Sequence, residues 1–218
     1  MASLPPASPA PPPTPATAIN GLARVRVFVD YWNFQLSLNE VTGDPKFGVN
    51  WKTLGAWLSQ KAAALVGVPS HSYDGCIIYT SYHPSTDQNY HRWATTWLNA
   101  QPGVTVNCLE RRAKAAPKCP ACHRPIVDCP HCTLPIKATV EKGVDTMIAT
   151  DMIRLAWEQA YDIAVLATQD ADLVPAVQFL NLKGRKVVHA GFPPKGRHLA
   201  AACWASFDVG KDAAQIRR

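Results

Sequence analysis

The sequence has no run of eighteen consecutive apolar residues, and its first 23 residues contain no Asp, Glu, Lys or Arg. Because a helix needs about 20 mainly apolar residues to cross a bilayer, we expect no membrane span. The start of the chain also lacks the basic residues and continuous apolar run of a secretory signal peptide. We therefore expect a cytoplasmic protein, in a reducing compartment where its seven cysteines bind metal more readily than they form disulfides.

The uncharged start is rich in proline, with seven prolines among residues 1–23. Such a segment cannot bury enough apolar surface to fold, so a disordered or polyproline-like arm is expected. The whole chain of 218 residues has room for one α/β domain and an accessory piece. Its net charge of +6 and its pI near 9.0 suit a polyanionic partner.

Strand and helix patterns alternate over residues 24–209, where we expect the folded domain. Strands are expected at 24–30, 73–82, 104–112, 162–168 and 185–191, and helices at 51–67, 85–103, 145–161, 173–184 and 198–204. The strands are apolar on both faces, which indicates an open parallel sheet covered by helices on two sides. A segment rich in Pro, Cys, Lys and Arg interrupts the pattern, and residues 210–218 are expected as a basic C-terminal tail.

Two of the expected strands end in acidic residues. VFVD is followed by YWN, which gives Asp30 and Asn33, and AVLATQDAD gives Asp170 and Asp172. Because the carboxyl ends of parallel strands lie along one edge of the sheet, these side chains should converge there. Clustered carboxylates repel one another unless a hard cation joins them. The pattern predicts a Mg²⁺ or Mn²⁺ site of the kind that hydrolyses phosphodiesters.

Each acidic residue also has a purely structural interpretation. Asp30 and Asn33 are frequent turn formers, and Asp172 could cap the helix that follows it. Asp145 could complement the dipole at the start of its helix. Asp151 lies six positions after Asp145, about 120° around a helix, so we expect it to support the site or to pair with Arg154 at i, i+3 rather than share a metal.

FVDYWNF at 28–34 resembles the opening strand motif of the NYN domain family, also called LabA-like or DUF88. Residues 142–187, from Lys-Gly-Val-Asp through Asp-Ala-Asp, resemble the remainder of its signature. The resemblance covers most of 24–209 and implies a PIN-like fold with metal-dependent ribonuclease activity. It implies catalytic or metal-binding roles for Asp30, Asn33, Asp145, Asp170 and Asp172. Gln169 and Leu173 depart from the family pattern but leave every carboxylate in place.

Four cysteines form C-x2-C-x6-C-x2-C in an insert expected at residues 113–137. Cys119, Cys122, Cys129 and Cys132 match the two thiolate pairs of a closed tetrahedral zinc site, which predicts a compact structural knuckle. His123 and His131 are alternative ligands, and two disulfides are a second alternative. Cys76, Cys108 and Cys203 lie in apolar contexts and are expected as buried thiols.

The insert is basic, with seven Lys or Arg and two Asp or Glu in residues 111–142. Beside a carboxylate edge the insert could bind the phosphate backbone of RNA, or it could serve only to stabilise the fold. The RNA-binding candidates are Arg111, Arg112, Lys114, Lys118, Tyr31 and Trp32. Further aromatics at the same edge could stack on unpaired bases, namely Tyr79, Tyr82 and His83, whereas Trp93, Trp97 and Trp157 are expected in the core.

Two functions are compatible with these features. The first is a Mg²⁺- or Mn²⁺-dependent endoribonuclease with structural Zn²⁺, acting on single-stranded or unpaired RNA. The second is a catalytically inactive RNA-binding or adaptor module on the same fold. A degraded site would have lost carboxylates and none is missing, which favours the enzyme. Whether the chain forms a homodimer is left open.

Overall fold

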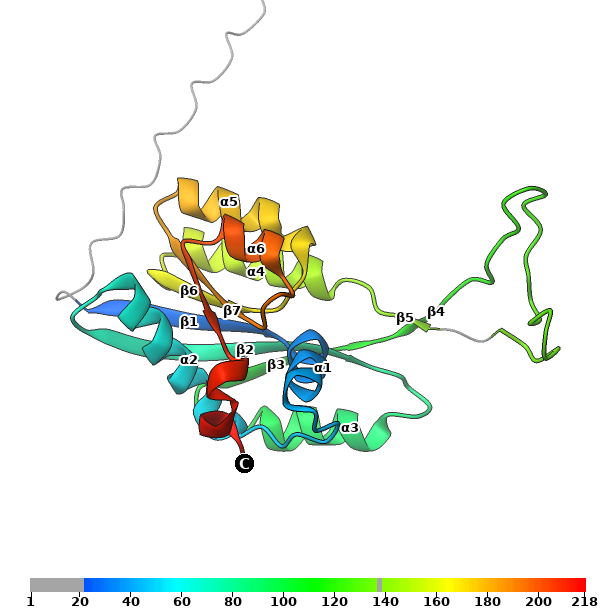
Figure 1. Cartoon of the computed structure of the whole chain (residues 1–218), viewed down its shortest axis with the longest axis horizontal. Coiled ribbons are helices and arrows are strands. Elements are labelled where there is room, and N and C mark those ends of the chain that lie inside the picture. The colour runs from blue at the N-terminus through cyan, green and yellow to red at the C-terminus, as the bar shows by residue number, and fades with distance from the viewer. Residues whose placement is uncertain (1–21, 137–138) are drawn as a thin grey trace, which may run out of the picture.

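The computed structural model describes residues 22–136 and 139–218 and shows a six-stranded parallel sheet between two layers of helices (Figure 1). The strand order is β3-β2-β1-β6-β7-β8. The strands are β1 (Ala23–Asp30), β2 (His71–Tyr82), β3 (Val104–Glu110), β6 (Ile163–Ala167), β7 (Lys186–Gly191) and β8 (Ala205–Asp208). The predicted open α/β sheet is therefore confirmed, while the predicted Pro-rich arm lies almost wholly outside the described residues.

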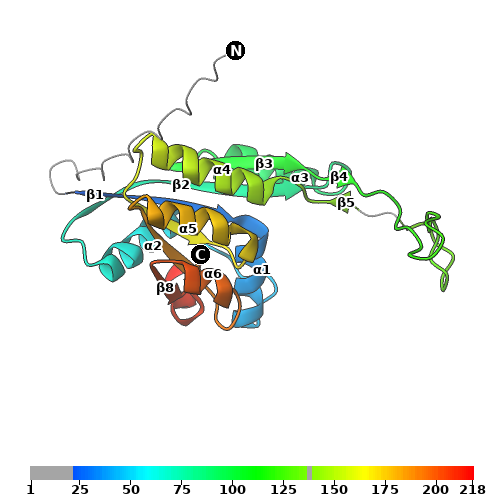
Figure 2. The ribbon, with the colours of Figure 1, turned by 90° about the horizontal axis from the view of Figure 1, so that it is seen from above.

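Helices cover both faces of the sheet. They are α1 (Tyr31–Thr42), α2 (Trp51–Val66), α3 (Gln88–Arg92), α4 (Val144–Trp157), α5 (Val174–Leu182) and α6 (Arg197–Ala202). Figure 1 shows α1, α2 and α3 on one side and α4, α5 and α6 on the other, and Figure 2 gives the same layers from above.

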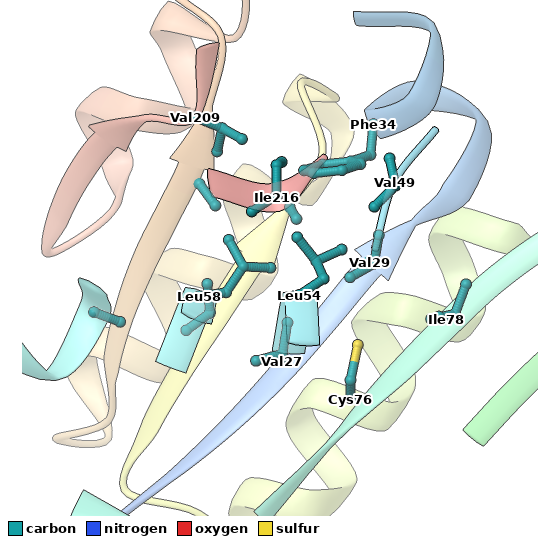
Figure 3. Packing of buried hydrophobic residues seen from close by; sticks show 14 of the residues in the cluster. Val27, Val29, Phe34, Val49, Leu54, Leu58, Cys76, Ile78, Val209 and Ile216 are labelled. Carbon is teal, nitrogen blue, oxygen red and sulfur yellow. The ribbon is translucent and has the colours of Figure 1, made fainter. Parts of the chain in front are cut away.

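Strand β1 lies in the middle of the sheet because both of its faces are apolar. It pairs in parallel with β2 on one side and β6 on the other. Val27 and Val29 face Leu54 and Leu58 of α2 in one buried cluster (Figure 3), whereas Phe28 packs in a second cluster beneath α4 and α5. Burial of apolar side chains contributes about 25 cal/mol per Å² and holds β1 in this central position. Asp30, the last residue of β1, is therefore held at the carboxyl edge of the sheet.

Two elements of the fold were not predicted. Helix α1 starts directly after β1, capped by the Asp30 carboxylate and ended by Gly43 in the left-handed conformation. Strand β8 forms the edge of the sheet beside β7. The predicted helix at 85–103 is instead α3 followed by the π-helix η2 (Trp93–Leu98).

The expected core position of two tryptophans was wrong. Trp157 at the end of α4 is 73% exposed, and Trp97 in η2 is 37% exposed. Helical spacing placed them on a face of their helices, but that face meets solvent rather than the sheet. Trp93 is only partly buried.

The insert projects from the domain, whereas the C-terminal segment packs onto it. Strand β4 (Arg112–Ala113) pairs antiparallel with β5 (Thr139–Val140), and the chain between them projects beyond the carboxyl edge of the sheet (Figures 1 and 2). Residues 210–216 form the 3₁₀ helix η4 (Gly210–Ile216), whose Ala213 and Ile216 are buried in the core. No helix among the described residues has the length and apolar character to span a bilayer.

Candidate metal-dependent active site

Asp30 and Asn33 tie the carboxyl ends of β1 and β6 together. The Asp30 carboxylate accepts a hydrogen bond from the Asn33 backbone N–H at 3.2 Å, which caps α1, and another from the Thr168 hydroxyl at 3.3 Å. The Asn33 side-chain oxygen accepts from the backbone N–H of Gln169 at 2.8 Å. These bonds span more than 130 residues of sequence and bring the two strand ends into one site.

Asp170 and Asp172 lie in the tight turn that follows β6. The Asp170 carboxylate accepts from the backbone N–H of Asp172 at 2.8 Å and thereby caps the 3₁₀ helix η3 (Ala171–Leu173). The capping role considered for Asp172 thus belongs to Asp170, and the Asp172 residue is exposed. Only Oδ1 of Asp170 accepts this bond, so Asp170 Oδ2 and the exposed Asp172 carboxylate can bind a ligand.

Asp145 comes to the same edge from the first turn of α4. Gly143, with φ of 93°, starts the helix in a conformation that favours glycine, so the Lys-Gly-Val-Asp entry has a steric basis. The pKa of Asp145 is raised, first by burial and then by the charges of Asp170, Glu141 and Asp172. The two strand ends and the start of α4 therefore place their carboxylates within electrostatic reach of one another.

Glu141 was missed in the sequence although it directly precedes the Lys-Gly-Val-Asp motif. Its carboxylate accepts a hydrogen bond from Ser81, at the end of β2, and forms an ion pair with Arg111 at 3.6 Å. Arg111 also donates to the Ser81 hydroxyl at 2.9 Å. The only signal for Glu141 in the sequence is its position directly before a recognised motif. Glu141 follows β5, so the β4–β5 pair at the base of the insert positions it near Asp30.

Among the carboxyls at this edge, Asp30 has the most strongly shifted pKa, and it is only 6% exposed. Its pKa is raised to about 6, mainly by burial and also by the charges of Glu141 and Asp145, while the bonds from Asn33 and Thr168 oppose the shift. Uncompensated negative charge of this kind is what a bound divalent cation would relieve.

The donor set fits such a cation, although the carboxylates do not form a closed cage. Within residues 22–136 and 139–218, no three His, Cys, Asp or Glu side chains converge closely enough to hold a metal ion. All-oxygen donors at an exposed edge are the ligands that Mg²⁺ and Mn²⁺ prefer.

The four cysteines of the insert form two matching turns. In the first, the backbone N–H of Cys119 donates to the Arg124 carbonyl; in the second, that of Cys129 donates to the Leu134 carbonyl. The residue after each second cysteine, His123 or Thr133, has a φ near 57°. Amides within each turn, first those of Cys122 and Cys132, lower the pKa of Cys119 and Cys129, which favours the thiolate form that binds metals.

The remaining cysteines and Asp151 have structural surroundings. Cys76 is buried as predicted, and burial raises the pKa of its thiol to about 12, whereas Cys108 and Cys203 are only partly buried. Asp151 pairs with Arg154 at 3.1 Å and accepts from the Tyr79 hydroxyl at 2.9 Å. The predicted i, i+3 ion pair within α4 is confirmed, and the bond from Tyr79 joins α4 to β2.

The predicted RNA-binding residues separate into three settings. Arg112, Lys114 and Lys118 are exposed at the base of the insert or within it, whereas Arg111 is partly buried against Glu141. Tyr79 is fully buried, so it cannot stack on a base. The others are distributed as follows: Tyr31 is buried and stacks on Trp51, Trp32 is partly buried, and Tyr82 stacks on His91.

Comparison with known proteins identifies the family. A solved structure of a protein of unknown function from Vibrio parahaemolyticus RIMD 2210633 matches with a TM-score of 0.53 and 14% identity, covering 89% of this chain and 98% of that one. This likeness shows the fold alone. No curated protein matches the chain significantly. The model of the NYN domain, a PIN-like family made up generally of nucleases, matches residues 24–208. The chain therefore belongs to the NYN domain family.

Proposed function

We propose that this protein is an endoribonuclease that hydrolyses RNA phosphodiester bonds with Mg²⁺ or Mn²⁺, within the LabA-like branch of its family. The observation that carries the proposal is the buried Asp30 carboxylate, whose pKa of about 6 reflects burial together with the nearby charges of Glu141 and Asp145. Such mutual repulsion is costly and is typical of sites built to hold a cation.

The residues that would hold the cation are Asp30, Asp145, Asp170 and Asp172, with Glu141 as a further carboxylate. A bound divalent cation would stabilise the charge on the phosphoryl oxygens and lower the pKa of the attacking water. Asn33 orients the site, because its side chain fixes the Gln169 backbone and its own backbone N–H fixes Asp30. Arg111 holds Glu141 at the edge and adds positive charge near the place where a phosphate would lie.

The proposal extends to one structural Zn²⁺ held by Cys119, Cys122, Cys129 and Cys132. Its support is the matched geometry of the two turns and the lowered pKa of the first thiol in each. Four thiolates in two close pairs suit tetrahedral Zn²⁺.

The test is cleavage of a mixture of unstructured RNAs by the wild type and by Asp170→Asn. Losing a ligand removes several kcal/mol of transition-state stabilisation, so we expect cleavage to fall by about a hundredfold or more. EDTA should abolish wild-type cleavage and Mg²⁺ or Mn²⁺ should restore it. Asp74→Asn is the matched control, because Asp74 lies in the N-terminal part of β2, away from the carboxyl edge.

Wild-type activity in Asp170→Asn would refute the assignment of the site. Absence of cleavage by the wild type with either metal, combined with RNA binding, would favour the inactive RNA-binding module instead.

A further inference from the structure

A pocket lined by aromatic rings lies directly beside the carboxylate edge. It has a volume of about 360 Å³, within the roughly 300–1,000 Å³ of ligand pockets. Its aromatic wall is formed by Tyr31, Trp32, Trp51, Trp93 and Trp97, which we call the aromatic pocket. The rings come from α1, from the start of α2 and from the π-helix η2, so three separate elements converge on one cavity.

The π-helix gives the pocket its open side. Trp93 and Trp97 stack with ring centroids 5.8 Å apart and planes 18° apart, and Trp97 is 37% exposed. Buried Tyr31 stacks on Trp51 at 5.3 Å and forms the inner wall. A π-helix is rare and is found mainly at functional sites, because it costs helix stability to reposition side chains. Here it presents two indoles on the side of η2 that faces α1.

Polar and basic groups complete the lining. Gln35 and Asn39 of α1 belong to it, and the Gln35 amide donates to Asn39 at 2.7 Å and to the Phe47 carbonyl at 2.9 Å. Lys46 and Arg218 lie at the rim and are exposed. Flat apolar walls, fixed carboxamides and cationic rims suit a planar heteroaromatic ring attached to a phosphate.

Trp32 connects the aromatic pocket to the carboxylates. Its indole N–H donates to the Ser81 carbonyl at 2.7 Å, and the Arg111 guanidinium lies 5.7 Å from its ring centroid. Ser81 and Arg111 in turn hold Glu141. Trp32 also follows Asp30 by two residues. A chain that reached from the carboxylates into the pocket would therefore pass along Trp32.

We propose that the aromatic pocket binds an unpaired nucleobase of the RNA strand, one that flanks the phosphate at the carboxylate edge. The position of that phosphate rests on the proposed function, whereas the pocket itself does not. A base held in a duplex cannot enter such a pocket, so the pocket would select single-stranded substrate. Stacking tolerates all four bases, since each has a π-face, and no sequence preference is needed.

A proline-rich segment is the other ligand that aromatic grooves accept. The chain has such a segment at its start, which joins β1 at Ala23, the end of that strand farther from the pocket. The basic rim and the adjacent carboxylate site favour RNA.

The test measures binding without cleavage. A labelled single-stranded RNA is titrated, in EDTA, with Asp170→Asn and with the same protein carrying Trp97→Ala. We expect Trp97→Ala to weaken binding about tenfold, within the roughly 1–3 kcal/mol found per stacked base. Trp97→Phe should restore most of the affinity because it keeps an aromatic face. Trp157→Ala is the matched control, since that tryptophan is more exposed and lies at the far end of α4.

Two further RNA ligands test whether the effect of Trp97→Ala comes from contact with an unpaired base. A fully paired duplex of the same sequence should bind the Trp97→Ala protein and its parent equally. An abasic nucleotide placed at successive positions should weaken binding at one position in the parent and at none in Trp97→Ala.

Equal affinity of the parent and Trp97→Ala for the single strand would overturn the proposal. It would also be overturned if a peptide of residues 1–21, and not RNA, bound with Trp97-dependent affinity. A wild-type protein that cuts no RNA but shows the Trp97 effect would refute the nuclease activity and support the pocket assignment.

Discussion

Asp30 is at once a helix cap and the most perturbed carboxyl of the site. As a cap it accepts the Asn33 N–H, which favours its charged form, but burial and the charges of Glu141 and Asp145 disfavour that form more strongly. Its pKa in the folded protein therefore lies above the ordinary value of 3.8. Well below pH 3.8 the folded and unfolded states both carry it protonated. The cost of ionising it in the folded state develops as the pH rises from 3.8 to 6 and is fully present above 6.

This sign predicts that Asp30→Asn stabilises the metal-free protein at neutral pH while eliminating cleavage. One pKa unit corresponds to about 1.4 kcal/mol, so in EDTA at pH 7.5 the variant should gain on the order of 2–3 kcal/mol in unfolding free energy, less any loss of capping strength. At pH 4, close to the unfolded-state pKa of 3.8, the gain should shrink to well under about 1 kcal/mol. Urea denaturation at both pH values measures it. If the variant were less stable than the wild type at pH 7.5, the ionised Asp30 carboxylate would not destabilise the folded protein, and the prediction would be wrong.

At the scale of residues, the sequence identified four acidic positions that the structure brings to one edge, because strand ends and a family motif both mark them. Glu141 could not be found in this way. It acts through Ser81 and Arg111, and neither contact leaves a periodic or motif signal. The prediction that Tyr79 could stack on a base was wrong for a different reason: its strand was recognised as buried, but not that the Tyr79 side chain lies beneath α4, where its hydroxyl bonds to Asp151.

At the scale of elements, the insert is a short internal repeat. Cys-Pro-x-Cys-x-x-Pro-Ile occurs at 119–126 and again at 129–136, and each copy folds into the same turn, closed by an isolated bridge. The cysteine spacing was recognised in the sequence, but the repeat around it was not. Two equivalent turns joined by two residues can face each other across a single ion, which is how tetrahedral thiolate sites are assembled.

We predict about one zinc ion per chain, measurable by elemental analysis of reduced protein. Cys129→Ser should lower the zinc content and leave the melting temperature of the sheet nearly unchanged, since the six strands pair without the insert. Cys76→Ser is the contrasting variant: it should retain zinc and lower the melting temperature, because Cys76 lies in the core. A folded, reduced protein without zinc would rule out the site.

An element could be predicted from the sequence when its packing against the core imposes a regular apolar pattern on it. The buried strands and long amphipathic helices were recognised because their periodicity is imposed by the core. Helix α1 was missed because it follows β1 without a loop, and β8 because four residues are too few to show a pattern. The π-helix η2 was predicted as one continuous helix with α3, because η2 follows α3 directly and its six residues are too few to reveal a different spacing.

At the scale of the whole molecule, the basic insert extends from the same edge that carries the carboxylates. Its root strands β4 and β5 connect directly to β3 and to Glu141, so charge on the insert lies on the approach to the site. Arg111 is already paired with Glu141, whereas Arg112, Lys114 and Lys118 are exposed and are the predicted phosphate-binding residues.

Replacing Arg112, Lys114 and Lys118 with Gln should therefore weaken RNA binding uniformly across sequences. The slope of log K against log salt should fall by about 0.7 for each phosphate contact removed from a single strand. Binding isotherms at three salt concentrations, in EDTA, give the slope, and zinc content should not change.

The charge-matched control replaces Arg154, Lys183 and Lys186, which lie at the end of α4, at the end of α5 and at the start of β7, away from the carboxyl edge. It should leave the slope unchanged. If both triple variants behave alike, the insert makes no specific phosphate contact and serves only the fold.

The bond between Thr168 and Asp30 has a consequence for how the protein is made. The two residues are 138 positions apart, and β6 reaches β1 only after β2, β3, the insert and α4 have been synthesised. Such long-range parallel pairing forms late in folding. A nascent chain still emerging from the ribosome thus carries Asp30 before Asp170 has been synthesised, and the carboxylate edge forms only when β6 pairs with β1. Under the proposed function, the chain would gain its cleavage activity at that step and not before.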